Sequence, residues 1–279
     1  MASTAGRSRV ARTRVIAVRG GRARERADGL AAEEPLEIRA AGPGQEPVRV
    51  AVTMRTPGHD FELAAGFLVT EGLIGPDDVA AVAYCEDPDA QRYNVVTVTS
   101  RGPFDLGAAE RNFFASSSCG ICGKAALEAV AVRCEPLEDG ATADAATLLG
   151  LPGAMRDAQQ VFERTGGLHA AGLFDLDGGL LLLREDVGRH NAVDKVVGAL
   201  ALEGGDGAGR ILLVSGRLSF EIVQKAAVAR VPILCAVSAP SSLAVEAAEA
   251  LGVTAVGFLR PGGFNVYARP GRILTAEPA

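Results

Sequence analysis

Residues 210–258 decide the fold, and they read RILLVSGRLSFEIVQKAAVARVPILCAVSAPSSLAVEAAEALGVTAVGF. Three short apolar runs in this stretch have the length of buried strands: 210–214, 233–237 and 254–258. Two segments of helical length lie between them, at 220–229 and 243–251. Strands that alternate with helices along a chain favour a largely parallel sheet covered by helices. This stretch therefore predicts an α/β domain with a mixed, largely parallel sheet.

The same domain extends upstream of residue 210. The sequence predicts a helix over 191–202 and, before it, a hairpin with strands at 168–174 and 179–184. Helical stretches are expected over 143–165. We expect an interruption at Gly150-Leu151-Pro152-Gly153, because glycine and proline are poor helix formers.

Residues 33–114 have the pattern of a smaller α+β unit. Its predicted elements are strands at 48–53, 79–85 and 93–100 and a helix at 60–73. We therefore divide the chain into three parts. They are a disordered arginine-rich tail over 1–32, an N-terminal α+β unit over 33–114, and a cysteine loop with the α/β domain over 115–279.

The formal net charge of −6 hides an asymmetry along the chain. Residues 1–30 carry eight arginines against Glu25 and Asp28, so the rest of the chain has a net charge of −12. An acidic body without a basic, aromatic-interleaved face argues against nucleic-acid binding. No apolar run reaches the length of a membrane span, and the N-terminus lacks the pattern of an export signal. Five cysteines are an odd number, which argues against a disulfide framework. We expect a cytoplasmic protein with reduced thiols.

Residues 116–124 read SSSCGICGK and place Cys119 and Cys122 three positions apart, before an apolar helical pattern. A helix N-terminus and the nearby Lys124 both favour the thiolate, the form that attacks electrophiles and binds metals. A structural zinc site would need isolated further ligands, because the sequence has no second Cys-x-x-Cys pair. A dithiol oxidoreductase and a carrier of sulfane sulfur both fit the spacing, which does not separate them.

Polar or glycine-rich segments follow four of the predicted strands. They are Arg189-His190-Asn191, Ser215-Gly216-Arg217, Ser238–Ser242 and Phe258-Leu259-Arg260-Pro261-Gly262-Gly263. In open α/β sheets, ligands bind at the carboxyl ends of the strands, beside the N-termini of the helices that follow. Arginines there can hold phosphate, and glycines let a ligand approach the backbone. These segments predict a site for a nucleotide or another phosphorylated ligand.

Several motifs in this order resemble the FdhD family of sulfur carrier proteins, also called formate dehydrogenase accessory sulfurtransferases. The matching segments are Ser118–Gly123, Thr165–Ala171 and Arg184–Lys195, with Glu34–Ile38, Arg55–Asp60, Ser215–Arg217 and Gly257–Gly262. The resemblance covers the chain from about residue 33 onward and implies a cytidine-deaminase-like fold for the larger domain. Deamination is not expected, because the helix starts at His190 and Ser215–Arg217 lack the zinc-binding cysteines of deaminases.

The resemblance implies an enzyme, a sulfurtransferase, that takes sulfur from a cysteine desulfurase. It delivers that sulfur to the molybdenum of the bis-molybdopterin guanine dinucleotide cofactor, which formate dehydrogenase requires. Cys119 matches the cysteine expected to carry a persulfide, and Cys122 is a candidate assistant. The segment expected to bind the nucleotide part of the cofactor matches Phe258, Leu259, Arg260, Pro261, Gly262 and Gly263.

The strand-end argument adds Arg189, His190, Asn191 and Arg217 to this site, and no bound metal ion is expected. The family also implies a homodimer that associates with a cysteine desulfurase and with formate dehydrogenase. A second interpretation stays open, in which the protein is a non-catalytic chaperone. It would hold the molybdenum cofactor and dock it to the apoenzyme.

Overall fold

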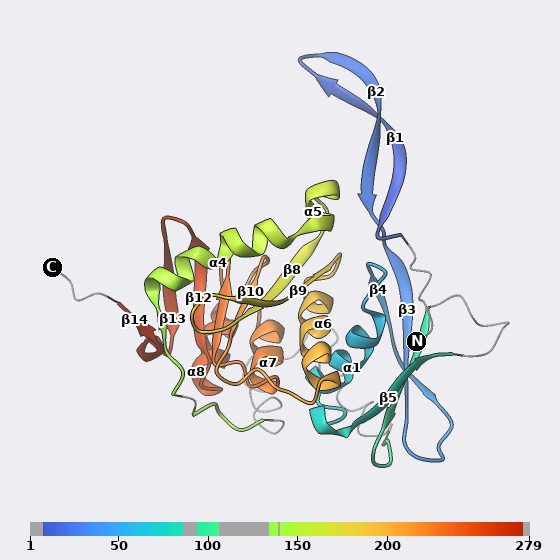
Figure 1. Ribbon diagram of the computed structural model, residues 1–279, viewed down its shortest axis with the longest axis vertical. Coiled ribbons are helices and arrows are strands. Elements are labelled where there is room, and N and C mark those ends of the chain that lie inside the picture. Colours follow the sequence, from blue (N-terminus) through green and yellow to red (C-terminus); the bar gives the residue numbers. More distant parts are fainter. Residues whose placement is uncertain (1–7, 86–93, 106–133, 139, 276–279) are drawn as a thin grey trace.

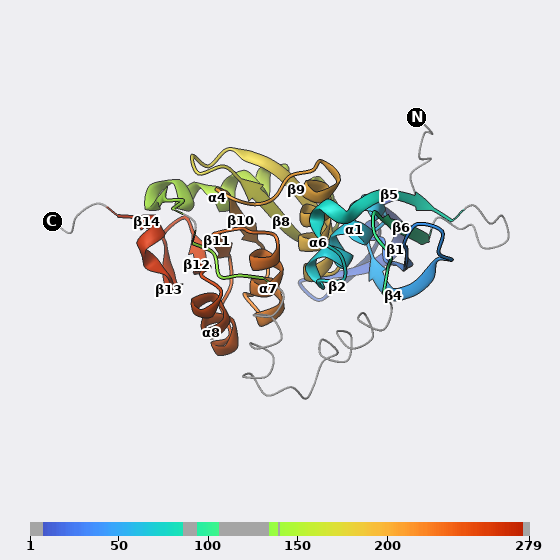
Figure 2. The same cartoon turned by 90° about the horizontal axis from the view of Figure 1, so that it is seen from below.

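The computed structural model describes residues 8–85, 94–105, 134–138 and 140–275 (Figure 1). Cys119, Cys122 and the helix predicted over 121–133 lie outside these residues. A six-stranded sheet and a four-stranded sheet lie at opposite ends of the main body, with helices between them (Figures 1 and 2). No helix in the described part of the chain is long and apolar enough to cross a membrane.

The six-stranded sheet forms the centre of the α/β domain, in the order β13-β12-β11-β10-β8-β9. Its strands are β8 (His169–Phe174), β9 (Leu180–Asp186), β10 (Ile211–Val214), β11 (Ile233–Ala236), β12 (Thr254–Arg260) and β13 (Gly263–Ala268). The pairs β10–β11 and β11–β12 are parallel, whereas β8, β9 and β13 join by antiparallel pairing. The predicted α/β class with a mixed sheet is therefore confirmed, and the parallel pairing lies at its centre.

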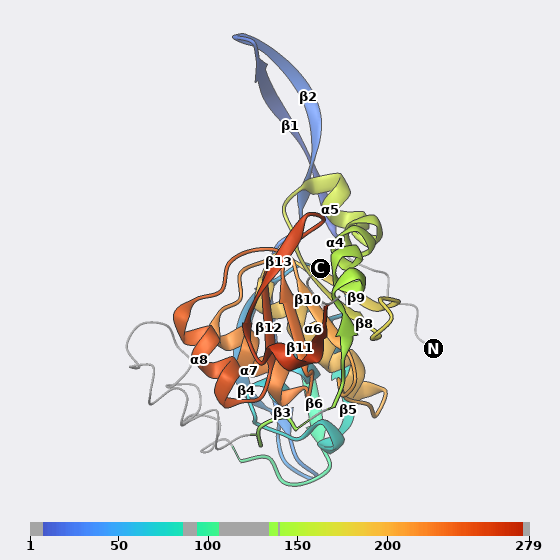
Figure 3. The same ribbon diagram turned by 90° about the vertical axis from the view of Figure 1, so that its left-hand side faces the viewer.

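Helices cover both faces of this sheet (Figure 3). One face packs against α6 (Arg189–Leu202), α7 (Phe220–Val228) and α8 (Ser242–Ala250), and the other against α4 (Ala145–Ala158). In β10, Leu212 and Val214 face the first layer, while Ile211 and Leu213 face the second. Because both faces of the strand are buried, its sequence is apolar without alternation, as the pattern at 210–214 predicted.

Helix α4 differs from the prediction. The expected interruption at Gly150–Gly153 is wrong, because α4 runs through Pro152 and ends at Ala158, and α5 (Gln160–Thr165) follows. Leu148, Leu151 and Met155 lie on one face of α4 and are buried against the sheet. This packing outweighs the poor intrinsic helix propensity of the segment.

The N-terminal unit is a four-stranded sheet in the order β4-β3-β6-β5, covered by α1 (Asp60–Thr70). Its strands are β3 (Glu34–Ala41), β4 (Val48–Arg55), β5 (Val79–Tyr84) and β6 (Val95–Ser100), with a short 3-10 helix η1 (Pro76–Asp78) before β5. Two short strands, β7 (Ala143–Asp144) and β14 (Ile273–Leu274), form a separate parallel pair. The 3-10 helix η2 (Pro270–Arg272) directly precedes β14.

Helices α1 and α6 join the two units by close backbone packing (Figure 2). A Cβ atom added to Gly66 would collide with the carbonyl oxygen of Asp194, and one added to Gly198 would collide with that of Glu62. Each helix therefore needs glycine where it crosses the other, and the two units share one continuous hydrophobic core.

The prediction of a disordered tail over 1–32 is wrong for residues 10–31. Strands β1 (Val10–Arg19) and β2 (Arg22–Ala31) pair antiparallel in full register and protrude from the body (Figure 1). Gly20 and Gly21 both have positive φ, 54° and 74°, which suits a tight two-residue hairpin turn. The arginine-rich composition hid the strand pattern, because long arginine side chains can lie across a neighbouring strand as well as in solvent.

Candidate functional site

The cysteine motif cannot be placed, because Cys119 and Cys122 lie outside the described residues. The other three cysteines, Cys85, Cys134 and Cys235, lie within the described residues. Cys235 is fully buried in β11, and burial raises the pKa of its thiol, which keeps it protonated and unreactive. Cys85 and Cys134 are half-buried.

The structure brings the carboxyl ends of β10, β11 and β12 together, as the sequence predicted. Leu218 N–H donates to Ala239 O at 3.1 Å, which links the loop after β10 to the loop after β11. Phe258 N–H donates to Ser238 O at 3.0 Å and links β12 to the same loop. The segments 215–217, 238–242 and 258–263 therefore form one edge of the domain.

A cleft of about 560 Å³ opens at this edge, between the strand ends and the layer of α4 and α5. Ser215 and Val237 line it from the ends of β10 and β11, and His169 lines it from the start of β8. Arg156 and Phe162 form part of the opposite wall, with the guanidinium carbon 4.3 Å from the ring centroid. This wall could not be predicted from the sequence, because it depends on how α4 and α5 pack on the sheet.

Arg189 and His190 start α6 beside the loop after β10. A Cβ atom on Gly216 would lie 3.5 Å from Arg189 Cδ and 3.6 Å from His169 Nδ1, so the three residues are in close proximity. Arg189 Nε and His190 Nε2 are buried and have no hydrogen-bond partner among the described residues. Buried polar atoms are nearly always satisfied, so this arrangement suits an additional anionic or hydrogen-bonding ligand. We call Arg189, His190 and residues 215–217 and 258–263 the strand-end cradle.

The two histidines near the cradle are held in their neutral form. Burial, together with the nearby positive charges of Arg189 and Lys225, lowers the pKa of His190 to about 4, although Glu221 and Glu71 act in the opposite direction. Burial and Arg189 also lower the pKa of His169. An anion bound beside His190 would favour its protonated form, so proton uptake would accompany binding.

The segment 258–263 combines a buried anchor with an exposed tip. Leu259 is fully buried, whereas Phe258 is exposed and has a positive φ of 54°. The guanidinium of Arg260 lies 6.0 Å from the Phe258 ring centroid. Added Cβ atoms on Gly262 and Gly263 would meet nothing within 4 Å, so the backbone at this turn is open to a ligand. A positive φ at a non-glycine residue is uncommon and often marks a functional position.

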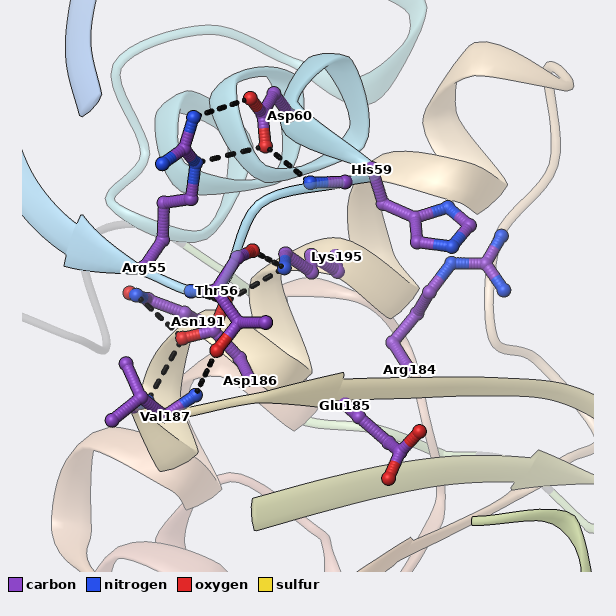
Figure 4. Close-up of polar contacts among 12 residues, drawn as sticks. Arg55, Thr56, His59, Asp60, Arg184, Glu185, Asp186, Val187, Asn191 and Lys195 are labelled. Atoms are coloured by element: carbon purple, nitrogen blue, oxygen red, sulfur yellow. Dashed lines mark hydrogen bonds and ion pairs between the residues drawn. The ribbon is translucent and has the colours of Figure 1, made fainter. Parts of the chain in front are cut away.

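Asn191 lies differently from its neighbours (Figure 4). Its amide nitrogen donates to Met54 O at 2.7 Å and to Asp186 Oδ1 at 3.0 Å, and the residue is buried. Its side chain thus joins β4 to the end of β9. The placement of Asn191 in the ligand site stays a prediction that these contacts do not support.

The segment Arg184–Lys195 also holds the two units together (Figure 4). Lys195 Nζ lies 2.7 Å from Asp186 Oδ2, and both side chains are fully buried. Thr56 takes part twice, because its N–H donates to Asp186 Oδ2 at 3.1 Å and its carbonyl accepts from Lys195 Nζ at 2.9 Å. The sequence motif therefore has a structural role that strand-end reasoning missed.

A second contact of this segment reaches the start of α1. Arg184 donates to both carboxylate oxygens of Glu62, and His59 Nδ1 lies 3.1 Å from Glu62 Oε2. Burial alone would raise the pKa of Glu62, but hydrogen bonds from Arg184 and His59 lower it to about 2. Glu62 is therefore ionised at neutral pH and fixes α1 to β9.

Comparison with known proteins identifies the family. The model of the FdhD/NarQ family matches residues 31–274. The sulfur carrier protein FdhD of Mycolicibacterium paratuberculosis is 53% identical over 94% of this chain and 98% of that protein. The sulfur carrier protein FdhD of Streptomyces avermitilis is 50% identical over 94% of this chain and 95% of that protein. The chain therefore belongs to the FdhD/NarQ family, as the sequence motifs predicted.

The fold also has a counterpart among solved structures. A crystal structure of a protein from Desulfotalea psychrophila, assigned as a formate dehydrogenase accessory protein, matches with a TM-score of 0.73. The match covers 96% of this chain and all of that chain, at 24% sequence identity. At this identity, the comparison supports the fold alone.

Proposed function

We propose that this protein is a cytoplasmic sulfur carrier that serves the maturation of formate dehydrogenase. The observation that carries the proposal is the high identity, over nearly the whole chain, to proteins named sulfur carrier protein FdhD. The motif Cys119-Gly120-Ile121-Cys122 supplies the sulfur chemistry that such a carrier needs.

Cys119 is the residue that carries sulfur in this proposal. Its thiolate attacks the outer sulfur of a persulfide on a cysteine desulfurase, and the donor cysteine leaves as a thiolate. Cys119 then holds a persulfide. A reduced acceptor gives two electrons to the outer sulfur and takes it as sulfide, so the acceptor is oxidised by two electrons and the Cys119 thiolate is restored. Cys122 assists without being required, because a single cysteine is sufficient for a carrier.

The acceptor is the molybdenum of bis-molybdopterin guanine dinucleotide, which the protein binds as cargo. The chemistry of the strand-end cradle fits the diphosphate and guanosine part of this cofactor. Arg189, His190, Arg217 and Arg260 supply hydrogen-bond donors, and Gly262 and Gly263 expose backbone for close approach. Arg189 Nε and His190 Nε2 have no hydrogen-bond partner among the described residues, although Glu221 Oε2 lies 4.0 Å from His190 Nε2, and these free donors support the placement of a phosphate group at this edge.

Binding of guanosine diphosphate tests the cradle, since this nucleotide stands in for one arm of the cofactor. A charge-assisted contact is worth about 1.5–3 kcal/mol, so Arg260→Ala should weaken binding roughly tenfold or more in calorimetry. Gly262→Val should also weaken binding, because the side chain would block approach to the backbone. Arg49→Ala is the matched control, since Arg49 is an exposed arginine on β4 in the N-terminal unit. Unchanged affinity in both cradle variants would move the site elsewhere.

Maturation of formate dehydrogenase in cells that lack this protein tests the whole function. The wild-type chain should restore formate dehydrogenase activity, Cys119→Ala should not, and Cys122→Ala should show a milder defect. Full activity with Cys119→Ala would reject the persulfide mechanism. It would instead favour the non-catalytic chaperone that binds the molybdenum cofactor.

A further inference from the structure

The cleft at the strand ends contains polar groups that the proposed function leaves unused. It has a volume of about 560 Å³ and lies between the sheet and the layer of α4 and α5. Met155, Phe162, Leu168 and Val237 give it apolar walls, and among the described residues no acidic side chain lines it. Binding sites for small molecules are clefts of roughly 300–1,000 Å³ with mostly apolar walls and a few polar groups. The cleft therefore has the size and the lining of a ligand site.

Gln159 is the polar residue of the cleft that most needs a partner. It lies between α4 and α5, is only 5% exposed, and lines the cleft. Its side-chain amide makes no hydrogen bond to any of the described residues, although an amide carries two N–H donors and one carbonyl acceptor. Because buried polar groups are nearly always hydrogen-bonded, this amide suits a ligand that presents a donor and an acceptor side by side.

Arg156 and Phe162 add a flat surface and a further donor to the cleft. The guanidinium of Arg156 lies over the Phe162 ring, with its carbon 4.3 Å from the ring centroid. Aromatic rings and guanidinium planes are the surfaces on which the planar rings of nucleotides stack. Arginine donors also favour rings that carry a carbonyl acceptor, such as guanine. This wall therefore suits a planar ring with an oxo group.

Glu185 holds the wall in place. Its carboxylate is buried and accepts hydrogen bonds from the N–H groups of Val161, at 3.1 Å, and Phe162, at 2.7 Å, in the first turn of α5. These two bonds tie α5 to β9 of the sheet. Because they fix the backbone of Phe162, little ordering of the wall is left to occur when a ligand binds, and this preorganisation favours affinity.

The cleft is continuous with the strand-end cradle. Ser215 belongs to both, and His169, which lines the cleft, lies close to Gly216 and Arg189 of the cradle. A ligand whose phosphate groups are held in the cradle can therefore place an attached ring in the cleft.

We propose that the cleft binds a fused amino-oxo-pyrimidine ring of the cofactor, and that Gln159 recognises the edge of this ring. The inference rests on the proposed function, because guanine and pterin, the two ring systems of that cofactor, share this edge. The amide of Gln159 pairs with the adjacent N–H and C=O groups of the edge. Phe162 packs on the plane of the ring, and Arg156 donates to one of its acceptors.

Calorimetry of the full chain with guanosine diphosphate, neopterin and inorganic pyrophosphate tests this proposal. Gln159→Leu and Phe162→Ala should weaken binding of the ring probe that occupies the cleft roughly tenfold. Both variants should bind pyrophosphate as the wild type does, because pyrophosphate reaches only the cradle. A loss for guanosine diphosphate assigns the cleft to guanine, and a loss for neopterin assigns it to the pterin.

Arg164→Ala is the matched control for Arg156→Ala, because Arg164 is an exposed arginine on α5 that does not line the cleft. Only Arg156→Ala should weaken the ring probe. The proposal is overturned if the wild type binds neither ring probe, or if Gln159→Leu and Phe162→Ala bind both with unchanged affinity. An equal loss for pyrophosphate would also overturn it, since that result indicates general damage to the site. Failure of the cradle is distinguishable, because Arg260→Ala would then leave the affinity for pyrophosphate unchanged.

Discussion

His190 is the residue at which charge and structure are most closely linked. Burial, Arg189 and Lys225 keep its pKa at about 4 in the folded chain, below its ordinary value of 6.5. The unfolded chain therefore takes up this proton first as the pH falls. His190 consequently lowers the stability of the fold progressively from about pH 6.5 down to about pH 4. A bound anion beside Nε2 would oppose this effect by raising the pKa.

We therefore predict that guanosine diphosphate binds more tightly at pH 5 than at pH 7, with uptake of a proton. His190→Gln should remove most of this pH dependence while leaving the fold intact. Calorimetry in buffers of different ionisation enthalpy measures the proton uptake, and nuclear magnetic resonance measures the pKa of His190 directly. A pKa near 6.5 in the free protein would contradict this account of the site.

The buried ion pair of Asp186 and Lys195 should contribute strongly to the stability of the fold. Both side chains are fully buried, so loss of one charge leaves the other without compensation. Asp186→Asn should lower the free energy of unfolding by about 3–5 kcal/mol, as measured by urea denaturation. The double variant Asp186→Leu/Lys195→Met should be less destabilised than Asp186→Asn, because it removes both charges. Equal stability of the wild type and Asp186→Asn would show that this pair, which contacts Thr56 of the N-terminal unit, does not help to hold the two units together.

At the scale of elements, the crossing of α1 and α6 determines how the two units fit together. Gly66 and Gly198 allow backbone contact that no larger residue permits. Gly198→Ala should therefore destabilise the protein by about 1–3 kcal/mol or more, since the added methyl group would force the helices apart. Gly150→Ala is the control: Gly150 lies in α4 with open space around it, and alanine favours a helix by about 1 kcal/mol. Thermal unfolding should show opposite shifts for these variants, and equal shifts would contradict the packing argument.

The elements also show what a sequence reveals and what it conceals. The strands and helices of 211–258 could be predicted to within about two residues, because buried strands are apolar on both faces. The continuity of α4 through Pro152 could not be predicted, since it depends on packing of Leu148, Leu151 and Met155 against a distant sheet. The hairpin of β1 and β2 could not be predicted for another reason. Many of the residues along its two strands are arginine or alanine, so the strands lack a clear alternation of apolar and polar residues.

Part of the candidate site could also be predicted from the sequence, and part of it could not. Convergence of the segments 215–217, 238–242 and 258–263 follows from the order of strands, and sequence reasoning found it. The wall of the cleft at Arg156 and Phe162, and the contact of Asn191 with Met54, arise from tertiary packing between remote segments. Such contacts leave no local signal in a single sequence.

At the scale of the whole molecule, the close packing of α1 on α6 and several buried ion pairs join the α+β unit to the α/β domain. The strand-end cradle lies on the α/β domain. The hairpin of β1 and β2 extends from this body near α5 (Figure 1). In the proposed function, this body holds the anionic cofactor at its strand ends, and Cys119 carries the sulfur. The proposed function depends above all on Cys119 as the residue that carries sulfur.

Intact-protein mass spectrometry tests this role of Cys119 most directly. The full chain is incubated with a cysteine desulfurase and free cysteine, and then measured with and without a thiol reductant. We predict a gain of about 32 Da, one sulfur atom, that maps to Cys119 and disappears on reduction. The gain should persist in Cys122→Ala and be absent in Cys119→Ala. No adduct on Cys119, or an adduct of equal amount in Cys119→Ala, would contradict the account.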